Sequence, residues 1–259
     1  MSTLVFQNPF STRFIQPGAI PWFAADTSLS ALLFRLYDVG NRAIICGPHG
    51  SGKSTILSHL ASVAQRQGLK VHCLRICSWI DAIRVMRVFA TMNPKQSIVS
   101  VDSWELLGFF GWFLCQFADF RGICVVVTVH EKPWWNNWPV LLHTKANDKT
   151  FRRLVYGLMT KFAGSETIEF SGEMLKDVFQ RHSGNLREAF FELYDHYERQ
   201  SRITISAKYS PQHMGIEVKE RQSCLFVSIK TAVSNVPWQI RKFSKQNDIF
   251  MERQFTIAT

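Results

Sequence analysis

A nine-residue segment contains the residue types that bind phosphate groups: Gly47-Pro48-His49-Gly50-Ser51-Gly52-Lys53-Ser54-Thr55. Its spacing is G-x-x-x-x-G-K-[ST], in which the glycines let backbone N–H groups curl around a polyphosphate without Cβ clashes. The Lys53 ammonium would reach the β- and γ-phosphates, and the Ser54 hydroxyl would ligate Mg²⁺. The segment therefore predicts a site for ATP and Mg²⁺ formed by all nine residues. The alternative is a glycine turn that binds nothing.

A carboxylate follows the apolar segment of residues 97–101. Asp102 would end a strand one βα unit beyond the glycine-rich segment, where a carboxylate faces Mg²⁺ directly or through water. Ser54 and Asp102 are thus the predicted metal-binding residues. The alternative for Asp102 is an ordinary turn or cap residue.

The next apolar segment, Val125-Val126-Val127-Thr128-Val129-His130, also ends in polar side chains. A polar group at the end of this strand would lie near the γ-phosphate. Thr128 is the predicted γ-phosphate sensor and His130 is the alternative. An ordinary strand terminus would explain the same residues without any ligand.

Alternating strand and helix patterns supply the elements that position these residues. Strands are predicted at residues 42–46, 69–76, 97–101, 123–129 and 167–170, and helices at 29–36, 53–66, 80–91, 104–117, 151–162, 171–180 and 185–199. This order predicts a parallel sheet in a three-layer α/β/α fold of the P-loop NTPase type. The expected organisation is an entry segment (1–40), a nucleotide-binding core (41–170), a small helical lid (171–200) and a weakly structured basic C-terminal extension (201–259).

The order of these motifs resembles AAA ATPases of the origin-recognition and transposition-helper type. The resemblance covers roughly residues 8–200 and includes Gly184-Asn185-Leu186-Arg187 at the start of a lid helix. The chain is also similar to a group of small bacterial P-loop ATPases that share the entry segment Asn8-Pro9-Phe10. This resemblance implies that the entry segment contacts adenine. The resemblance implies that Arg187 reaches the γ-phosphate, since arginine suits bidentate phosphate contact. The alternative is a surface arginine on a capped helix.

Two departures from that family bear on hydrolysis. Hydrolytic members have Glu directly after the strand-ending Asp, whereas this chain has Ser103. The nearest acid is Glu105, which would either orient the attacking water or lie in the first turn of the next helix, where acids are favoured. No arginine finger is evident, and Arg152 and Arg153 are candidates by position only. The predicted catalytic residues are Lys53, Glu105, Thr128 and Arg187.

Aromatic residues gather in two segments. The loop Trp134-Trp135-Asn136-Asn137-Trp138-Pro139 is interpreted as a local core under the sheet edge, with base stacking or a protein contact as the alternative. Phe109, Phe110, Trp112 and Phe113 are predicted to be buried core. His72, Cys73 and Cys77 are also interpreted as core rather than as a metal site.

Composition limits the remaining possibilities. The chain has 259 residues, 46% of them hydrophobic and 13% aromatic, which excludes disorder throughout. Its six cysteines lack CxxC spacing, which favours a reducing compartment. The sequence starts without a signal-peptide pattern, and the longest apolar run, residues 106–115, is half of the ~20 residues that a membrane span needs. We therefore expect a cytoplasmic protein without a membrane span.

Net charge is +10, and residues 201–259 hold nine Lys or Arg against four acids. Such a tail either binds nucleic acid or is simply solvated. The expected function is that of an AAA-like ATPase that couples ATP binding or hydrolysis to a conformational change on a protein or DNA partner, with a homo-oligomer also open. One alternative is a nucleotide-gated binding module with little hydrolysis. A small-molecule kinase is the second, although the Trp-rich stretch stands where such enzymes have a lid rich in Arg and Lys.

Overall fold

The computed structural model describes residues 7–22, 28–162 and 168–208. The chain divides into two units, residues 1–207 and 208–259. All that follows concerns the first unit, apart from Lys208 at the end of its last helix. The basic extension predicted for residues 201–259 lies outside the described residues from position 209 onward.

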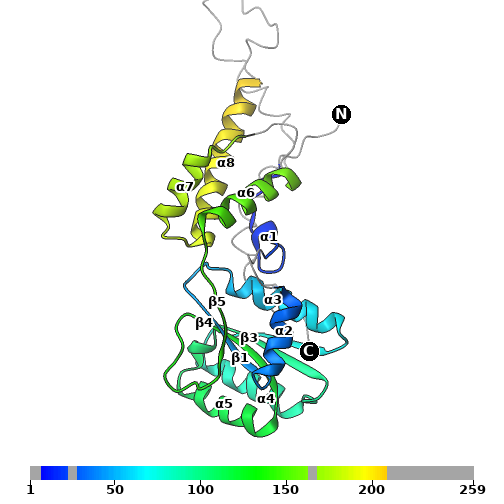
Figure 1. Ribbon diagram of the computed structural model, residues 1–259. Coiled ribbons are helices and arrows are strands. Elements are labelled where there is room, and N and C mark those ends of the chain that lie inside the picture. Colours follow the sequence, from blue (N-terminus) through cyan, green and yellow to red (C-terminus); the bar gives the residue numbers. More distant parts are fainter. Residues whose placement is uncertain (1–6, 23–27, 163–167, 209–259) are drawn as a thin grey trace, which may run out of the picture. The chain divides into compact units, whose positions relative to one another are not determined.

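Five parallel strands form one sheet in the order β2-β3-β4-β1-β5 (Figure 1). Their bounds are Arg42–Cys46 for β1, Lys70–Arg75 for β2, Ser97–Asp102 for β3, Cys124–Val129 for β4 and Val140–His143 for β5. The expectation of an α/β fold with a parallel sheet is confirmed. Because β1 lies between β4 and β5, the segment that follows β1 emerges at the carboxyl edge among the ends of its neighbours.

The fifth strand is not the one predicted. β5 lies within residues 131–147, which the sequence pattern predicts to be a Trp/Pro-rich loop. Residues 168–170, where the fifth strand was predicted, form no strand. β5 is short and pairs with β1 across an irregularity between Ile44 and Ile45, where Ile44 N donates to the Pro139 carbonyl. Phe170 instead packs in a helical core. A short apolar run has no periodicity that separates these two outcomes.

Helices cover both faces of the sheet. On one face lie α2 (Leu29–Asp38) and α3 (Lys53–Arg66), and on the other lie α4 (Ala82–Thr91) and α5 (Phe109–Arg121). Short 3₁₀ helices, η1 (Trp79–Asp81) and η2 (Trp104–Leu107), precede α4 and α5. These elements form the three layers that the strand and helix pattern predicts.

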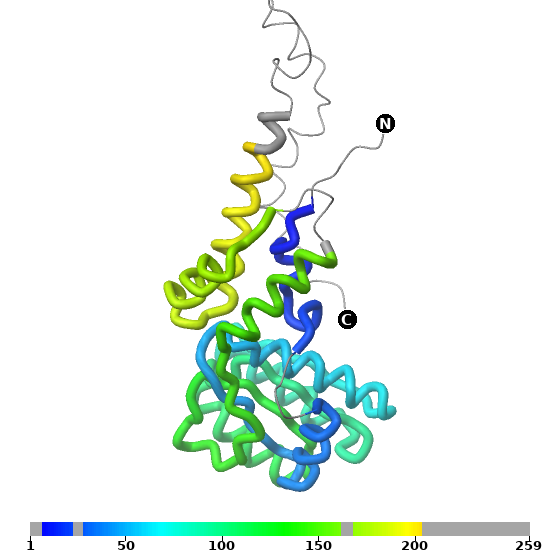
Figure 2. The backbone as a smooth tube through the Cα atoms, turned by 45° about the horizontal axis from the view of Figure 1, so that its top comes forward, coloured from blue at the N-terminus to red at the C-terminus, as the bar shows by residue number. Residues whose placement is uncertain are grey.

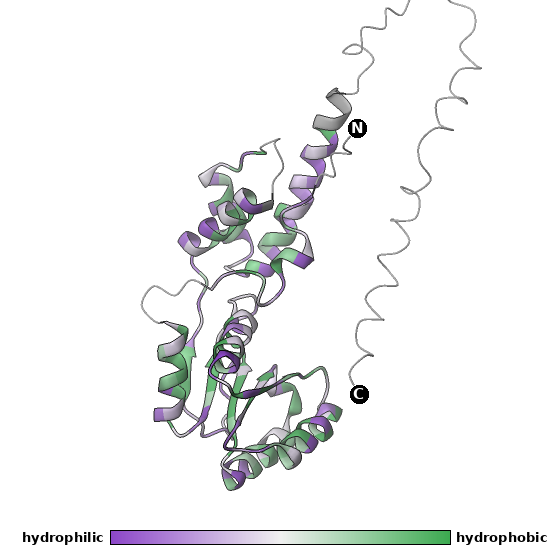
Figure 3. Ribbon diagram, turned by 90° about the vertical axis from the view of Figure 1, so that its right-hand side faces the viewer, coloured by the Kyte–Doolittle hydropathy of each residue, from purple (hydrophilic) through white to green (hydrophobic). Residues whose placement is uncertain are grey.

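Alternation along the strands divides the core into two clusters. Ile44, Val125 and Val127 pack with α4 and α5, whereas Ile45 and Val126 pack with α2 and α3. Successive strand side chains point to opposite faces, so a strand covered on both sides is apolar throughout. The strands are coloured mainly as hydrophobic residues in Figure 3.

A third cluster joins the chain's beginning to the C-terminal helices. It contains residues of α6 (Asp148–Phe162), α7 (Gly172–Arg181) and α8 (Leu186–Lys208), and the segment that includes the short helix α1 (Thr12–Ile15) lies beside α6 (Figure 2). Phe10 is 1% exposed and contacts the rings of Phe170, Phe190 and Tyr197 at centroid distances of 5.6–6.3 Å. Asn8 Nδ2 donates to the Tyr194 carbonyl. The Asn8-Pro9-Phe10 motif thus anchors the entry segment in the helical core.

The two helices that the sequence predicts as a lid, α7 and α8, begin where their capping residues predict. The Ser171 side chain accepts a hydrogen bond from Met174 N at the start of α7. Asn185 Oδ1 accepts from Arg187 N and Glu188 N at the start of α8. An Asn or Ser at this position satisfies N–H groups that have no partner within the helix. α8 continues to Lys208, beyond the predicted end at residue 199.

The prediction that four aromatic residues of α5 belong to the buried core is wrong. Phe109, Phe110, Trp112 and Phe113 are 41–76% exposed. Helix geometry explains this, because only the stripe containing Gly111, Leu114, Cys115 and Ala118 faces the sheet. Cys73, on the edge strand β2, and Cys77, two residues after that strand, are also exposed rather than core.

The Trp-rich loop does form a local core, with one exception. Trp138 is 5% exposed, lies 5.8 Å from the Trp104 ring and donates from Nε1 to Asp119. Trp135 packs against the same cluster. Trp134 alone is 93% exposed.

Candidate functional site

The glycine-rich segment, residues 47–55 and called the P-loop below, connects β1 to α3 at the carboxyl edge of the sheet. Gly50 and Gly52 have φ values of +67° and +93°, a region that residues with a Cβ rarely adopt. Gly52 is the N-cap of α3, so the free N–H groups of that helix begin at Lys53. This is the strand–loop–helix context that the motif requires.

Lys53 is the buried cation of the P-loop. Its side chain is held by the loop itself, because Nζ donates to the carbonyls of Gly47 at 2.6 Å and Pro48 at 2.8 Å. The residue is 8% exposed. Burial lowers the pKa of Lys53, and the charges of Glu105 and Asp102 act against that shift. The ammonium is therefore fixed inside the curve of the loop.

The two predicted metal-binding residues meet. Ser54 Oγ donates to the Asp102 carboxylate, with distances of 3.0 and 2.9 Å to its two oxygens. Thr128 Oγ1 donates to Asp102 Oδ1 at 2.5 Å and accepts from Ser103 N at 2.9 Å. Thr128 is 1% exposed, so the predicted phosphate sensor is occupied in orienting Asp102. Ser103 itself has a φ of +64°.

Glu105 lies at the same edge and pairs with the alternative sensor residue, His130. Glu105 Oε1 contacts His130 Nδ1, while the buried Oε2 has no hydrogen-bond partner among the described residues. The His49 ring lies on the His130 ring with centroids 3.6 Å apart. The His130 ring and burial lower the pKa of His49, and Lys53 acts in the same direction. Sequence reasoning named His130 but missed its pairing with Glu105 and the role of His49 in covering it.

Thr144, just after β5, is a contact residue that the sequence analysis missed. Its Oγ1 lies 2.6 Å from Ser51 Oγ, and its N–H donates to the Cys46 carbonyl at 2.7 Å. A Cβ on Gly47 would lie 2.2 Å from Thr144 Oγ1, so only glycine fits there. Thr144 could have been found from its position directly after the strand that pairs with β1. That inference requires β5 to be predicted correctly.

The start of α8 rests on the P-loop. Leu186 N donates to the Gly50 carbonyl at 3.3 Å, and a Cβ on Gly50 would lie 1.8 Å from Asn185 Oδ1. The positive charge of Arg187 contributes to the lowered pKa values of both Lys53 and His49. The structure therefore brings the predicted lid motif to the same edge as Lys53, Ser54, Asp102 and Glu105.

The other predicted site residues lie on the P-loop, in the first turn of α3 and on α6. Pro48 and His49 are exposed on the P-loop, and Thr55 is half-buried in the first turn of α3. Arg152 pairs with Asp148 within α6. The arginine finger stays a prediction.

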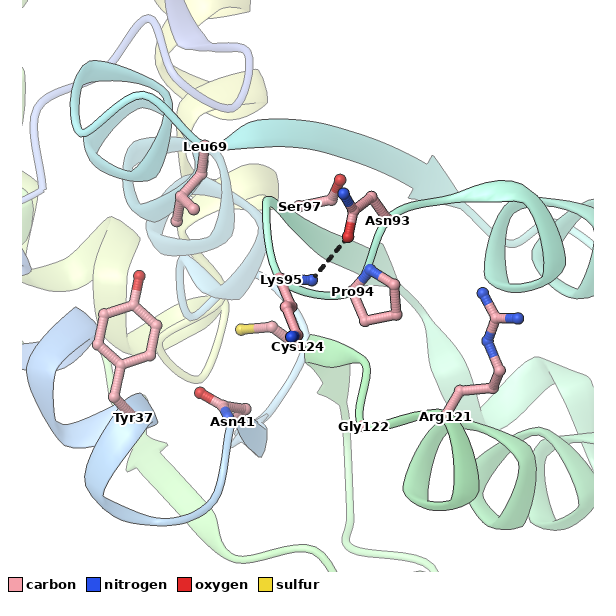
Figure 4. A pocket seen from close by; sticks show the side chains of 10 residues that line it. All are labelled: Tyr37, Asn41, Leu69, Asn93, Pro94, Lys95, Ser97, Arg121, Gly122 and Cys124. Atoms are coloured by element: carbon pink, nitrogen blue, oxygen red, sulfur yellow. Dashed lines mark hydrogen bonds between the residues drawn. The ribbon is translucent and has the colours of Figure 1, made fainter.

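Cavities lie at both ends of the sheet's strands. One of about 340 Å³ adjoins the P-loop at Pro48 and is also lined by Lys145, Phe179 and Gly184. The other, of about 560 Å³, lies at the amino ends of the strands and is lined in part by Tyr37, Asn41, Lys95, Arg121 and Cys124 (Figure 4). Burial raises the pKa of the Cys124 thiol to about 12, so this cysteine stays neutral. Of these two, the cavity of about 340 Å³ is the one lined by a P-loop residue, Pro48.

Two kinds of feature are absent from the described residues. The described ranges contain no group of three or more His, Cys, Asp or Glu side chains that could hold a metal ion. Within the same ranges, no helix combines the length and apolar character that crossing a membrane requires.

The five-stranded parallel sheet and its two helical layers define a three-layer α/β/α domain. Among solved structures, the crystal structure of domain III from the Thermotoga maritima replication initiation protein DnaA is similar, with a TM-score of 0.50 and 14% identity. The match covers 77% of this chain and 92% of that one. No protein-family model and no curated protein matches the chain. At this identity the likeness shows the fold alone.

Proposed function

We propose that this chain is an Mg-ATP-binding P-loop NTPase of the AAA-like type. The observation that carries the proposal is the buried Lys53 ammonium, held by Gly47 and Pro48 beside the Ser54–Asp102 pair. On nucleotide binding, phosphate oxygens would replace the two carbonyls as partners of Nζ. Lys53 would neutralise the β- and γ-phosphates, while P-loop N–H groups bind the remaining oxygens.

The side chains beside the P-loop fit a magnesium ion. A hydroxyl and a carboxylate are hard oxygen ligands, and Ser54 Oγ lies within 3.0 Å of both Asp102 oxygens. Ser54 and Asp102 would hold the ion, which would supply positive charge to offset the charge of the phosphate groups. Thr128 holds Asp102 in position, which makes it a positioning residue for the metal site.

The lid supplies the conformational change. The Leu186 N–Gly50 carbonyl hydrogen bond joins α8 to the loop that binds phosphate, so a phosphate-induced shift of the loop changes this contact. Arg187 would contact the γ-phosphate and would lose that contact after hydrolysis. We propose that this movement is transmitted to a protein or DNA partner.

Glu105 is the residue proposed to orient the attacking water. Its Oε2 is a buried acceptor with no partner among the described residues, and His130 holds the other oxygen. Position 103, where the family has glutamate, has a left-handed φ of +64° and holds serine. In this chain Glu105, two residues after position 103, would orient the water that the family's glutamate orients.

A nucleotide-gated module with little turnover is the second candidate. The specific observation is that Glu105 is already paired with His130, which competes with any role in activating water. In this case ATP binding alone would set the lid position, and hydrolysis would be slow in the isolated protein.

Calorimetry with Mg-ATP tests nucleotide binding. Lys53→Ala is expected to weaken binding at least ~100-fold without lowering the melting temperature, because a charge-assisted contact to phosphate is lost. Lys132→Ala, which changes an exposed lysine in a loop, is the matched control and should bind as the parent does. Unchanged affinity in Lys53→Ala would refute the proposal.

Phosphate release separates the two candidates. If Glu105 orients water, Glu105→Gln should lower kcat by ~100-fold or more while leaving ATP affinity unchanged. His130→Asn should lower kcat less, since it acts through Glu105. A basal rate that neither variant changes would show that another group positions the water.

A further inference from the structure

The outer face of the α4–α5 layer carries an exposed apolar surface, called the aromatic surface below. Its members come from η1, α4, η2 and α5 and are 41–88% exposed: Trp79, Ile80, Ile83, Leu106, Phe109, Phe110, Trp112, Phe113 and Phe120. Monomeric proteins rarely expose contiguous apolar surface on this scale, and larger patches mark interaction sites.

Ring contacts connect members of the aromatic surface on η1 and α5. The rings of Trp79 and Phe110 stack at 5.8 Å with an interplanar angle of 15°, which joins η1 to α5. The rings of Phe109 and Trp112 stack at 5.7 Å within α5. Four of the nine side chains are therefore paired ring to ring on this side of the protein and are not isolated apolar residues.

Folding does not require these side chains to be apolar. The inner faces of the same helices are already filled by Val85, Phe89, Leu107 and Leu114, each no more than 1% exposed. The solvent side of a surface helix is normally polar, whereas Phe109, Phe113 and Phe120 lie exposed on α5. The outer apolar side chains of α5 are therefore available to contact a partner outside this domain.

The charges around the aromatic surface are positive. Arg84 and Arg87 are exposed on α4 and form no ion pair with the described residues. The three carboxylates on these elements are bonded within the protein: Asp81 to backbone N–H groups, Glu105 to His130, and Asp119 to Arg42. The partner of this face must accordingly offer apolar groups and negative charge.

We propose that the aromatic surface binds the interface of an anionic lipid bilayer. Exposed Trp and Phe side chains partition into the region between headgroups and acyl chains, and arginines bind lipid phosphates. Among the nine residues of the aromatic surface, the side-chain hydrogen-bonding groups are the indole N–H groups of Trp79 and Trp112, whereas a typical protein interface carries about ten hydrogen bonds. A bilayer needs no such pattern, and this difference favours lipid over protein.

Other occupants fit the charges less well. Two copies meeting through this face would bring Arg84 and Arg87 toward the same arginines of the partner. Residues 209–259 carry seven Lys or Arg against four acids, so the C-terminal segment shares the sign of the face. An acidic amphipathic helix of a partner protein is the other possible occupant, and the experiments below distinguish it from a bilayer.

Co-sedimentation of the full chain with vesicles tests the proposal. One set contains phosphatidylcholine alone and the other adds about 30% phosphatidylglycerol. We expect the protein to bind the anionic vesicles at least ~10-fold more tightly, and high salt to weaken that binding. Equal or undetectable binding to the two sets would overturn the proposal.

Variants tie the binding to this face. Phe109→Ser with Phe120→Ser should weaken vesicle binding by ~10-fold or more, since both rings leave the bilayer. Arg84→Gln with Arg87→Gln should reduce only the preference for anionic vesicles. Phe34→Ser is the matched control, because Phe34 is 61% exposed on α2, on the other face of the sheet. Circular dichroism melts check that each variant is folded.

Three results would refute the assignment. The first is vesicle binding that the Phe109/Phe120 variant retains in full. The second is an oligomer of the parent that this variant dissociates, which would make the face an interface between copies. The third is an acidic amphipathic peptide that binds the face while vesicles do not. The proposal does not depend on nucleotide binding, so Lys53→Ala should bind vesicles as the parent does.

Discussion

The two helical layers on the sheet differ sharply on their outer sides. In the α2–α3 layer, the large apolar side chains exposed among the described residues are Phe34 and Tyr37. The α4–α5 layer with its 3₁₀ helices exposes nine, six of them aromatic. Both layers contribute a buried cluster of similar kind to the sheet. The comparison separates apolar residues that fold the protein from apolar residues that are available for a partner.

The largest expected effect lies on the inner side of the α4–α5 layer. Phe89 is fully buried and its ring lies 6.5 Å from that of Trp104, so Phe89→Ala leaves a cavity under the sheet. It should lower the free energy of unfolding by about 3–5 kcal/mol, measured by urea denaturation. Ile83→Ala, on the outer side of the same helix, is the control. Similar losses in both variants would remove the distinction between the two sides.

A smaller effect is expected where α5 meets the Trp-rich loop. A Cβ on Gly111 would lie 2.6 Å from Trp135 Cη2, so Gly111→Ala must displace that ring. The expected cost is about 1–3 kcal/mol in urea denaturation. Gly157→Ala in α6 is the matched control, because a Cβ there meets no atom within 4 Å, and alanine should be neutral or stabilising. A neutral Gly111→Ala would show that the loop is not packed against α5.

The α2–α3 layer should respond to the loss of a helix cap. Ser28 Oγ accepts from Ala31 N at the start of α2. Ser28→Ala should lower the melting temperature by an amount equivalent to about 1 kcal/mol, since that N–H loses its partner. Ser30→Ala, an exposed change two residues into the same helix, should have no such effect. Equal melting temperatures for Ser28→Ala and the parent would contradict the cap.

The smallest effect on stability is expected on the outer side of α5. Phe120 is 88% exposed, and Phe120→Ser should change the free energy of unfolding by no more than about 0.5 kcal/mol. The same variant should aggregate less, as measured by light scattering at equal concentration. A loss above about 2 kcal/mol would show that the outer aromatic side chains are part of the folded core.

Local patterns predicted the elements that carry the P-loop. The expected bounds of β1 and α3 agree with the structure, because a glycine-rich turn and helical periodicity are properties of consecutive residues. The proximity of Ser54 and Asp102 was also predicted. Carboxyl ends of parallel strands meet at one edge of a sheet, so one rule about topology was enough.

Contacts between distant segments were not predicted. Thr144 reaches the P-loop only because β5 pairs with β1, and the sequence placed the fifth strand elsewhere. The pairing of Glu105 with His130 depends on how η2 sits beside the end of β4. Neither pairing has a signature within a short window of residues.

The amino-acid sequence by itself determined the strand–loop–helix unit around Lys53, the parallel α/β class and the caps of the lid helices, because hydrogen bonds and backbone conformations between near neighbours specify them. Tertiary structure decided which polar groups at the sheet edge are already bonded and which side of α5 faces water. Those outcomes depend on which surfaces the rest of the chain leaves uncovered. Phe113 and Leu114 are adjacent apolar residues of one helix, yet the packing of α5 on the sheet leaves the first 50% exposed and buries the second.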